Sequence, residues 1–382
     1  MPSEPRPVRV GIVGCGDISR EYLLGCRLFD VVDVVACADH EPQRAADAAA
    51  EFDVPRACGP EELLADPDVE IVLNLTPPFA HAEVSLAAIA RGKHVYSEKP
   101  LGATLQEAEA VLSAASQAGV RVGAAPDTFL GGGVQTCRKL IDDGWIGTPV
   151  AAMAFVASHG YEHFHPRVGF YYQAGGGPML DVGVYYLTAL VNLLGPVVRA
   201  SGSAIRPSER RVIAKEANRP IEIPVEVATH VAGTLDFRSG VVASVVASWE
   251  VWSNGLPFIE IYGTEGSMSI PNPDAFHGAP RIRRPREREL QDYPPRDAGE
   301  WQAIPVTHRE DVMRGIGIAD MAHALRHGVE HRAGGDLARH VLEVMLAFER
   351  SNDEGSHVHV RSDCERPRPL PPAVVGSPLS FD

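Results

Sequence analysis

Two short segments of the chain carry side chains suited to acid–base chemistry on an alcohol or a ketone. The first is Glu98-Lys99-Pro100, which directly follows an apolar run that we predict to be a strand. A lysine at the end of a strand can hold a substrate oxygen or lower the pKa of a neighbouring acid. Pro100 can adopt the cis form, which would fix the turn and aim Lys99 inward. The alternative is that Lys99 is a solvated surface residue.

The second segment is a glycine loop at residues 175–177, followed by an apolar helix predicted over residues 179–194. Asp181 and Tyr185 are four residues apart, so one face of this helix carries both. An aspartate in an apolar stretch is costly unless it is paired or functional, and a tyrosine phenol can act as an acid–base group when a cation lowers its pKa. Lys99 is our candidate for that cation. The alternative is that Asp181 caps the helix and Tyr185 belongs to the core.

A glycine turn, GCGDIS at residues 14–19, lies between a predicted strand and a predicted helix. Gly14 allows a tight turn, and Gly16 lets the backbone approach a pyrophosphate. The helix that begins near Asp17 and Ile18 then offers free N–H groups and a positive dipole end to the phosphates. The third glycine position of this fingerprint holds a serine, which is small enough for close helix–strand packing. Without further context such a turn is weak evidence for nucleotide binding.

Asp39 supplies part of that context, because it ends the second predicted strand at about the expected 20 residues beyond the glycines. A carboxylate in this place accepts both ribose hydroxyls and repels a 2′-phosphate, so NAD is favoured over NADP. Arg44 lies near enough in the sequence to weaken that preference. The alternative is that Asp39 is the N-cap of the following helix.

The order of the predicted elements indicates what positions these residues. Up to residue 126, apolar strands alternate with helices, which is typical of a doubly wound parallel sheet, the Rossmann fold. The predicted strands are 8–13, 31–38, 71–75, 94–97 and 120–124, and the predicted helices are 17–29, 42–51, 81–91 and 105–118. Such sheets bind ligands at the carboxyl ends of their strands, where Asp39 and Lys99 fall.

After residue 126 the pattern changes. The predicted helices are 135–143, 179–194 and 337–350, and the predicted strands are 225–237, 241–252, 258–262 and 267–270. These strands alternate in character, which predicts a large, mainly antiparallel sheet flanked by helices, with one freer face. We therefore predict two domains: a Rossmann domain that binds NAD(P) over residues 1–126, and a C-terminal α+β domain for substrate binding and dimerisation over residues 127–382.

Composition limits the partners. The chain has 382 residues and a formal net charge of −15, which argues against nucleic acid or an anionic membrane as the main partner. Its longest apolar stretch, residues 182–198, is interrupted and falls short of a membrane span of roughly 20 residues. The six cysteines form no C-x-x-C pair and we see no signal peptide, so we expect a cytoplasmic protein with reduced, buried thiols. We interpret the proline- and arginine-rich segment 271–305 as an exposed excursion.

Four motifs occur in order along the chain: VGIVGCGDIS, NLTPP, GKHVYSEKP and GGGPMLDVGVYYL. Together they resemble the family of glucose–fructose oxidoreductase, inositol dehydrogenase and the rhizopine catabolism protein MocA (Gfo/Idh/MocA). The resemblance implies that Lys99 contacts cofactor and substrate, that Asp181 orients substrate hydroxyls, and that Tyr185 is the acid–base residue. It also implies that Thr76, Pro77 and His81 border the nicotinamide pocket. We therefore expect cofactor contacts from Gly14, Gly16, Asp17, Ile18, Asp39, Arg44, Thr76, Pro77, His81, Glu98 and Lys99.

The sequence departs from the family pattern in its substrate region. Tyr185 stands where the inositol dehydrogenase type has a histidine, and the acidic residue often found three or four positions further on is missing. The sequence PDTF at residues 126–129 replaces the usual Asn/Glu-x-x-Arg stretch. These changes leave the cofactor prediction standing but weaken any transfer of substrate identity.

Several polar and aromatic side chains in this half are candidates for substrate contacts. Our predicted substrate-binding residues are Lys99, Asp127, His163, His165, Asp181 and Tyr185. We interpret the two histidines as hydrogen-bond donors to a polyhydroxylated substrate, because their spacing matches no strong zinc pattern, and we predict no metal site. Tyr171 and Tyr172 either stack on a sugar or belong to the core. Arg314 and Asp320 either reach the pocket or pair at the surface.

We therefore predict an NAD-dependent oxidoreductase, with NADP the less favoured cofactor. It would transfer a hydride between the nicotinamide and a hydroxyl or keto group of a sugar, glycoside or cyclitol. Two alternatives stay open: an NAD-dependent glycoside-cleaving enzyme that oxidises its substrate transiently before elimination, and a non-catalytic dinucleotide-binding sensor. We expect a homodimer or homotetramer formed through the C-terminal sheet.

Overall fold

The computed structural model describes residues 6–162, 168–213, 221–284, 300–373 and 381. The chain divides into two compact units, and each is built from more than one segment. The first comprises Met1–Gly131, His308–Arg339 and Leu370–Asp382, and the second comprises Gly132–Thr307 and His340–Pro369. The unit that holds the N-terminal sheet therefore includes three stretches that we assigned to the C-terminal domain, residues 127–131, 308–339 and 370–382.

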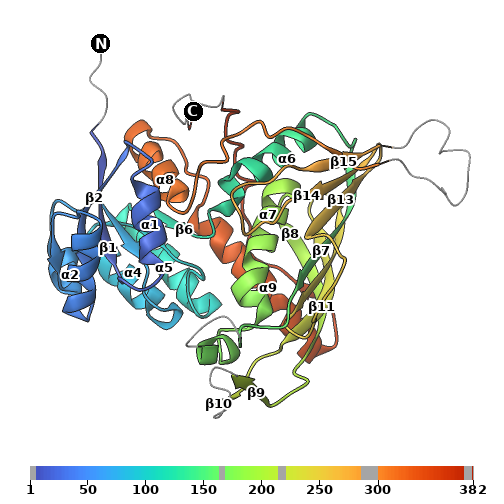
Figure 1. Cartoon of the computed structure of the whole chain (residues 1–382), viewed down its shortest axis with the longest axis horizontal. Helices are drawn as coiled ribbons and strands as arrows, with labels where there is room; N and C mark the ends of the chain where they lie inside the picture. Colours follow the sequence, from blue (N-terminus) through green and yellow to red (C-terminus); the bar gives the residue numbers. More distant parts are fainter. Residues whose placement is uncertain (1–5, 163–167, 214–220, 285–299, 374–380, 382) are drawn as a thin grey trace, which may run out of the picture. The chain divides into compact units, whose positions relative to one another are not determined.

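The first unit contains a six-stranded parallel sheet with the strand order β3-β2-β1-β4-β5-β6. This arrangement confirms the predicted Rossmann fold. Figure 1 labels β1, β2 and β6 of this sheet. Its strands are β1 (Val8–Val13), β2 (Val32–Ala38), β3 (Ala57–Cys58), β4 (Ile71–Asn74), β5 (His94–Ser97) and β6 (Val122–Ala124). Its helices are α1 (Ser19–Cys26), α2 (Pro42–Glu51), α3 (Pro60–Ala65), α4 (His81–Ile89), α5 (Leu105–Ala118) and α8 (Ile316–His327), with short 3₁₀ turns η1 (Pro78–Ala80) and η2 (Thr128–Leu130).

Apolar strands and well-marked helix ends explain this fold. β4 is buried along its whole length, as expected for a parallel sheet covered on both faces. α5 begins after Thr104, whose hydroxyl accepts the N–H of Glu107 at 3.2 Å, while the Glu107 carboxylate accepts the N–H of Ala103 at 2.8 Å. It ends at Gly119, whose φ of 68° suits a left-handed C-cap. These signals are local, which is why the sequence predicts both ends of the helix.

The segment around α8 is an integral part of the first unit. α1 packs closely against it, because a Cβ on Gly25 would lie 1.7 Å from the carbonyl oxygen of Arg314. Further along, the N–H of Ala124 in β6 donates to the carbonyl of Ala333 at 3.0 Å, and an isolated bridge follows at Gly334. Since β6 is an edge strand, this segment covers an otherwise open sheet edge. Our sequence prediction contains no helix at α8.

The second unit is built on a nine-stranded sheet with the order β16-β15-β14-β13-β7-β12-β11-β8-β17. Neighbouring strands are antiparallel except for β7 and β12, so the predicted mainly antiparallel sheet is confirmed. Its strands are β7 (Pro149–Ala157), β8 (Val197–Ile205), β11 (His230–Phe237), β12 (Val242–Ser248), β13 (Ile259–Gly263), β14 (Ser267–Ile270), β15 (Arg281–Arg283), β16 (Gln302–Ala303) and β17 (Val358–His359). β9 (Arg210–Ile213) and β10 (Ile221–Pro224) form a separate antiparallel pair, the β9–β10 ribbon.

Helices cover one face of the large sheet. Figure 1 shows α6 (Gly132–Asp142), α7 (Val184–Leu194) and α9 (Gly335–Glu354) along that face. Along β7, buried Ala152, Ala154 and Val156 alternate with more exposed residues such as Met153, so the other face is freer. Two short turns complete the unit, the 3₁₀ turn η3 (Val168–Tyr172) and the π-helical turn η4 (Met179–Gly183). Among the described residues, we find no helix whose length and hydropathy would let it span a bilayer.

The prediction of an exposed excursion over residues 271–305 is wrong for β15. Arg281 and Arg283 flank the buried Ile282, which is the alternation of a strand with one covered face. β15 pairs with β14 and β16 and so extends the sheet. Residues 285–299, which include Arg286 and Arg288 of the arginine-rich run, lie outside the described residues.

Candidate functional site

The glycine turn has the backbone geometry that a dinucleotide phosphate requires. Gly14 has a φ of +100°, and a Cβ there would lie 2.7 Å from the carbonyl oxygen of Leu75, so a side chain does not fit. Gly16 is exposed, and a Cβ there would meet nothing within 4 Å, which leaves the backbone open to a ligand. Ser19 is buried, and its hydroxyl donates to the Gly16 carbonyl at 2.6 Å. The turn therefore fits a pyrophosphate at the N-terminus of α1.

Three other predicted cofactor residues lie around this turn. Asp17 is exposed and Ile18 is the N-cap of α1, so their backbone N–H groups lie where a phosphate would bind. Arg44 in α2 is partly exposed, and its Nε lies 3.0 Å from Oε2 of Glu41. Its positive charge is therefore already paired with a carboxylate.

Asp39 directly follows β2, in the same sheet as the strand that leads into the glycine turn, and its side chain is buried. Its Oδ2 accepts the N–H of Cys15 at 2.8 Å, and its Oδ1 accepts the N–H of Glu41 at 2.9 Å. The N-cap of α2 is Glu41, so Asp39 is not the cap that we considered as an alternative. A carboxylate has about four lone-pair sites. Nδ1 of His40 also lies 3.1 Å from Oδ1, so Oδ2 is the oxygen that keeps capacity for a hydroxyl donor. The residue thus fits a ribose.

One histidine ties the loop after β4 to the loop after β5. His81 is buried, with Nδ1 2.6 Å from the carbonyl oxygen of Pro100 and Nε2 2.6 Å from that of Thr76. Burial lowers the pKa of His81, and the two carbonyls oppose that shift because they favour a ring that donates from both nitrogens. Pro77, between these contacts, is exposed. His81 therefore fixes the positions of these two loops relative to each other.

Asn74 also holds the loop after β4, and sequence reasoning gave it no role. It is fully buried at the end of β4, and its Oδ1 accepts the hydroxyl of Thr76 at 2.6 Å and the Thr76 N–H at 3.2 Å. Its Nδ2 donates to the carbonyl of His81 at 2.9 Å. A buried amide at the carboxyl end of a parallel strand is the signal that would have found it.

The Glu98-Lys99-Pro100 turn is held by buried hydrogen bonds. Glu98 accepts the hydroxyl of Tyr22 at 2.8 Å with Oε1 and the N–H of Lys99 at 2.9 Å with Oε2. The Lys99–Pro100 peptide bond is cis, as the sequence suggests. Lys99 is partly buried. Glu98 thus orients the backbone at Lys99, and the cofactor contact that we expect from Glu98 stays a prediction.

Asp127 occupies a place that the sequence did not predict. It is fully buried, and its Oδ2 accepts the N–H groups of Gly315 and Gly317 at 3.0 Å each, at the start of α8. Burial raises the pKa of the Asp127 carboxyl. A side chain in this place holds a helix, so the geometry gives no support to a contact with substrate. Two further predicted substrate residues, His163 and His165, lie outside the described residues.

Arg314 and Asp320 take separate roles. Asp320 forms a buried ion pair with Arg332 and accepts the backbone N–H of Arg332 at 2.5 Å. Asp320 is therefore a buried structural residue, which neither of the two alternatives anticipated. The Nη1 of Arg314 lies 4.0 Å from Oε1 of Glu98, which brings this cation next to the Glu98-Lys99 turn.

Asp181 and Tyr185 belong to the second unit and to one continuous helix. The helix opens with the π-helical turn η4 and continues as α7, and such turns are frequent at functional sites. Asp181 is partly buried, and its N–H donates to the carbonyl of Gly177 at 3.0 Å. The N-cap is Pro178, so Asp181 lies inside the helix and does not cap it. Tyr185 is 5% exposed.

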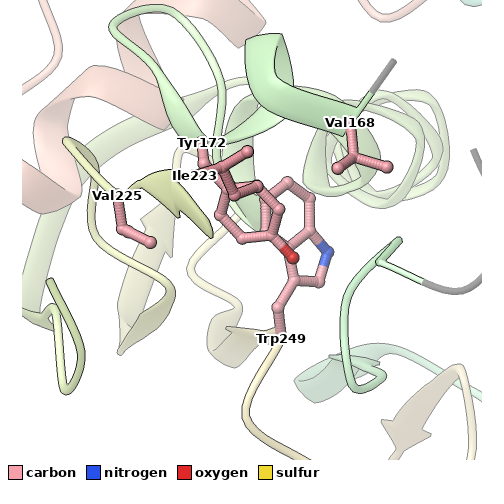
Figure 2. Close-up of a cluster of buried hydrophobic side chains, with 5 residues drawn as sticks. All are labelled: Val168, Tyr172, Ile223, Val225 and Trp249. Carbon is pink, nitrogen blue, oxygen red and sulfur yellow. The ribbon is translucent and has the colours of Figure 1, made fainter. Parts of the chain in front are cut away.

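Tyr172 belongs to a small aromatic core in the same unit. Figure 2 shows it beside Trp249, within a cluster completed by Val168, Ile223 and Val225. The two rings meet edge to face with their centroids 5.2 Å apart. Tyr172 is fully buried and is therefore a core residue, whereas Tyr171 is partly buried and packs against the cluster.

The first unit has a parallel sheet, an open glycine turn and a buried carboxylate after the second strand, and this combination is typical of dinucleotide-binding proteins. Comparison with family models agrees with this. The oxidoreductase family with an NAD-binding Rossmann fold matches residues 8–125, and the GFO/IDH/MocA C-terminal domain matches residues 134–269. The chain therefore belongs to the Gfo/Idh/MocA family of oxidoreductases.

Its relatives within the family include sugar reductases. The chain is 33% identical over 261 residues to 1,5-anhydro-D-fructose reductase of Ensifer adhaerens, which covers 68% of this chain and 74% of that relative. It is 29% identical over 304 residues to dTDP-3,4-didehydro-2,6-dideoxy-alpha-D-glucose 3-reductase of Streptomyces antibioticus, with 77% and 85% covered. A levoglucosan dehydrogenase in complex with NADH and levoglucosan has a similar structure, with a TM-score of 0.78, 21% identity, and 93% of this chain and 100% of that chain covered. At that identity the likeness establishes the fold alone.

Proposed function

We propose that this oxidoreductase uses NAD to interconvert a hydroxyl and a keto group on a sugar, glycoside or cyclitol. The nicotinamide, when bound, accepts or donates the hydride, and the side chains of the protein supply the proton transfer and the orientation. The observation that carries the proposal is the pairing of a dinucleotide-ready glycine turn with family relatives that are named for sugar reduction.

The choice of NAD over NADP is supported by the surroundings of Asp39. The carboxylate is fixed by two backbone N–H groups and would lie against a 2′-phosphate, which it repels. Arg44, the nearby cation that would favour such a phosphate, is paired with Glu41. We therefore expect the Kd for NADH to be lower than that for NADPH, and Asp39→Ala to narrow the difference.

Within the second unit, we assign the proton transfer to Tyr185 and the binding of a neighbouring hydroxyl to Asp181. Tyr185 takes the hydroxyl proton during oxidation and returns it during reduction. We assign to Lys99 the orientation of the reacting oxygen. The support for these roles is chemical and positional: each residue stands at the family motif position, and Asp181 and Tyr185 lie four apart in one helix.

The decisive experiment is a substrate panel read by NADH absorbance. The panel comprises levoglucosan and myo-inositol with NAD, and 1,5-anhydro-D-fructose with NADH or NADPH. We expect net formation or consumption of NADH with at least one member. Turnover without net change in NADH would favour transient oxidation followed by elimination, and no turnover with tight NADH binding would favour a dinucleotide sensor.

Two substitutions test the assigned roles. We expect Lys99→Ala and Tyr185→Phe to lower kcat by at least roughly 100-fold, which is the usual contribution of a positioned acid–base group. NADH titration by fluorescence should show that both variants still bind the cofactor. Parent-like turnover in both variants would exclude the proposed assignment.

We further propose that the protein is a cytoplasmic homo-oligomer formed through the freer face of the nine-stranded sheet. All six cysteines are free thiols, which supports a reducing compartment. The face exposes apolar side chains from neighbouring strands, including Met153 and Val242. Exposed apolar surface of this kind is typical of association sites.

A further inference from the structure

The β9–β10 ribbon sends one arginine inward. Along β9 the side chains alternate: Arg210 and Val212 are exposed, whereas Arg211 is 9% exposed. Arg210 pairs at the surface with Glu222 on β10, with Nη1 2.7 Å from Oε2. A guanidinium that leaves water in this way is costly unless carboxylates or carbonyls satisfy it.

Three acceptors from two other parts of the unit satisfy Arg211. Its Nη1 donates to Oε1 of Glu162 at 3.0 Å, and its Nη2 donates to Oε1 of Glu250 at 2.6 Å and to the carbonyl of Trp249 at 3.1 Å. The Glu162 side chain is 5% exposed. Glu250 is in turn held by the hydroxyl of Thr229. Arg211 therefore bridges the end of β12 to the segment that precedes Asp181.

The same arginine also touches the aromatic core of that segment. Its guanidinium carbon lies 5.8 Å from the ring centroid of Tyr172, the residue that Figure 2 shows against Trp249. A Cβ on Gly160 would lie 2.3 Å from the Tyr172 hydroxyl and 2.5 Å from Oε2 of Glu162, so both oxygens converge on this glycine. The turn η3 is thus held at Tyr172, next to the ion pair.

From η3 a short chain of backbone hydrogen bonds leads to Asp181. The N–H of Glu226, just after the ribbon, donates to the carbonyl of Tyr172 at 2.8 Å. The N–H of Gly177 donates to the carbonyl of Tyr171 at 2.8 Å, and the N–H of Asp181 donates to the carbonyl of Gly177 at 3.0 Å. The position where η4 begins therefore depends on where η3 is held.

We propose that Arg211 is a positioning residue for the substrate side of the enzyme: it fixes η3 and, through η3 and the glycine loop, the place of Asp181. The inference rests on the proposed role of Asp181 in binding a substrate hydroxyl. It assigns the β9–β10 ribbon a part in sugar recognition, although Arg211 itself need not contact the sugar. A displacement of about 1 Å at a substrate-binding group is enough to cost roughly 100-fold in rate.

The test compares Arg211→Ala with Arg210→Ala, its exposed neighbour on the same strand. With levoglucosan and NAD, or 1,5-anhydro-D-fructose and NADH, as probes, we expect Arg211→Ala to lower kcat/KM by roughly 10- to 100-fold. NADH affinity should stay within about twofold of the parent, because the cofactor residues belong to the other compact unit. Arg210→Ala should leave kcat/KM, KM and NADH affinity near the parent values.

Amide hydrogen exchange supplies a readout that needs no substrate. We expect Arg211→Ala to speed exchange in peptides that contain Val168–Tyr172 and Met179–Gly183, while peptides from β1 and β4 exchange as in the parent. Arg210→Ala should change neither set. If no sugar in the panel is turned over, the proposed function fails, and exchange still decides whether Arg211 holds this segment.

Milder variants keep the proposal testable if Arg211→Ala does not fold. Arg211→Lys keeps the charge but lacks the planar fork that bridges Glu162 and Glu250, so we expect an intermediate loss of kcat/KM. Glu162→Ala should act in the same direction, and the double variant should lose no more than Arg211→Ala alone. A folded Arg211→Ala with parent-like kcat/KM and exchange overturns the proposal, as does an equal loss in Arg210→Ala.

Discussion

Asp127 is buried in the core of the first unit, and its Oδ2 accepts the N–H groups of Gly315 and Gly317 at the start of α8. Asp127→Ala removes that acceptor, and we expect it to lower the free energy of unfolding by about 3 kcal/mol, since each hydrogen bond to a charged group contributes roughly 1.5–3 kcal/mol. Asp127→Asn keeps an oxygen in place and should cost less than about 1 kcal/mol. Urea unfolding followed by circular dichroism measures both, and equal losses would contradict the helix-holding role.

The same residue gives stability a pH dependence of defined sign. Because burial raises the pKa of Asp127, the folded state holds more protons than the unfolded chain between the unfolded pKa of about 3.9 and the raised folded value. Stability therefore falls as the pH rises through this window. Asp127→Asn has no carboxyl group to titrate at this position. As the pH rises through the window, the free energy of unfolding of the variant should therefore increase relative to that of the parent. A constant difference across the window would contradict this.

At the residue scale, the sequence predicted what depends on local motifs and missed what depends on distant partners. Gly14 and Gly16 lie in the turn between β1 and α1, and Asp39 directly follows β2, which are the positions that their spacing in the sequence predicts. The hydrogen bonds of Asp127 to Gly315 and Gly317 join residues about 190 positions apart, so its place in the core could not be predicted from the local sequence. The ion pair of Arg211 with Glu162 joins residues 49 positions apart, and no local sequence pattern predicts such a pair.

At the scale of elements, His81 joins the loops that follow β4 and β5. Its loss in His81→Ala leaves two carbonyls without a ring partner, and buried polar groups left unsatisfied cost about 1–3 kcal/mol each. We expect NADH binding to weaken by roughly 10-fold or more, measured by fluorescence titration. The matched control is His94→Ala, at the amino end of β5, where Nδ1 accepts the N–H of Arg121 at 2.9 Å. That variant should lose stability but keep NADH affinity; equal weakening in both would contradict the prediction.

Elements with strong end signals were predictable, and elements without them were not. α2 starts at a proline and α5 runs between a threonine cap and a glycine, and both match their predicted ranges. β7 lies at the middle of the large sheet but is rich in alanine, which has a low strand propensity. Its pairing with β12 and β13, which the local sequence does not predict, stabilises it as a strand. α8 begins among glycines and has no local capping side chain. The carboxylate that accepts N–H groups at its start belongs to Asp127, which is distant in the sequence.

At the scale of the whole molecule, we expect copies of the chain to associate through the freer face of the large sheet. Met153 lies on that face opposite Ser244 on one side and Glu260 on the other. Met153→Lys places a charge in the proposed interface while Glu260 offers it a partner within the same chain, so the fold should tolerate it. We expect the variant to have a lower mass by light scattering than the parent, because burying the lysine and Glu260 at an interface removes two charges from water, at a cost of several kcal/mol per ion. Leu28→Lys, at an exposed apolar residue of the first unit, should not change the mass; an unchanged mass for Met153→Lys would contradict the prediction.

The discontinuous make-up of the first unit has a consequence for how the protein is synthesised. The ribosome delivers β1 to β6 early, but α8 and the residues that cover the edge of β6 follow only after all of Gly132–Thr307. At the usual rate of about 5–20 residues per second, that interval lasts roughly 10 to 35 s. Throughout it, the surface under Gly25 and the free side of β6 lack their partners. The nascent Rossmann sheet is therefore incomplete for most of translation, and an exposed strand edge in that period is where chaperone binding or mispairing would act.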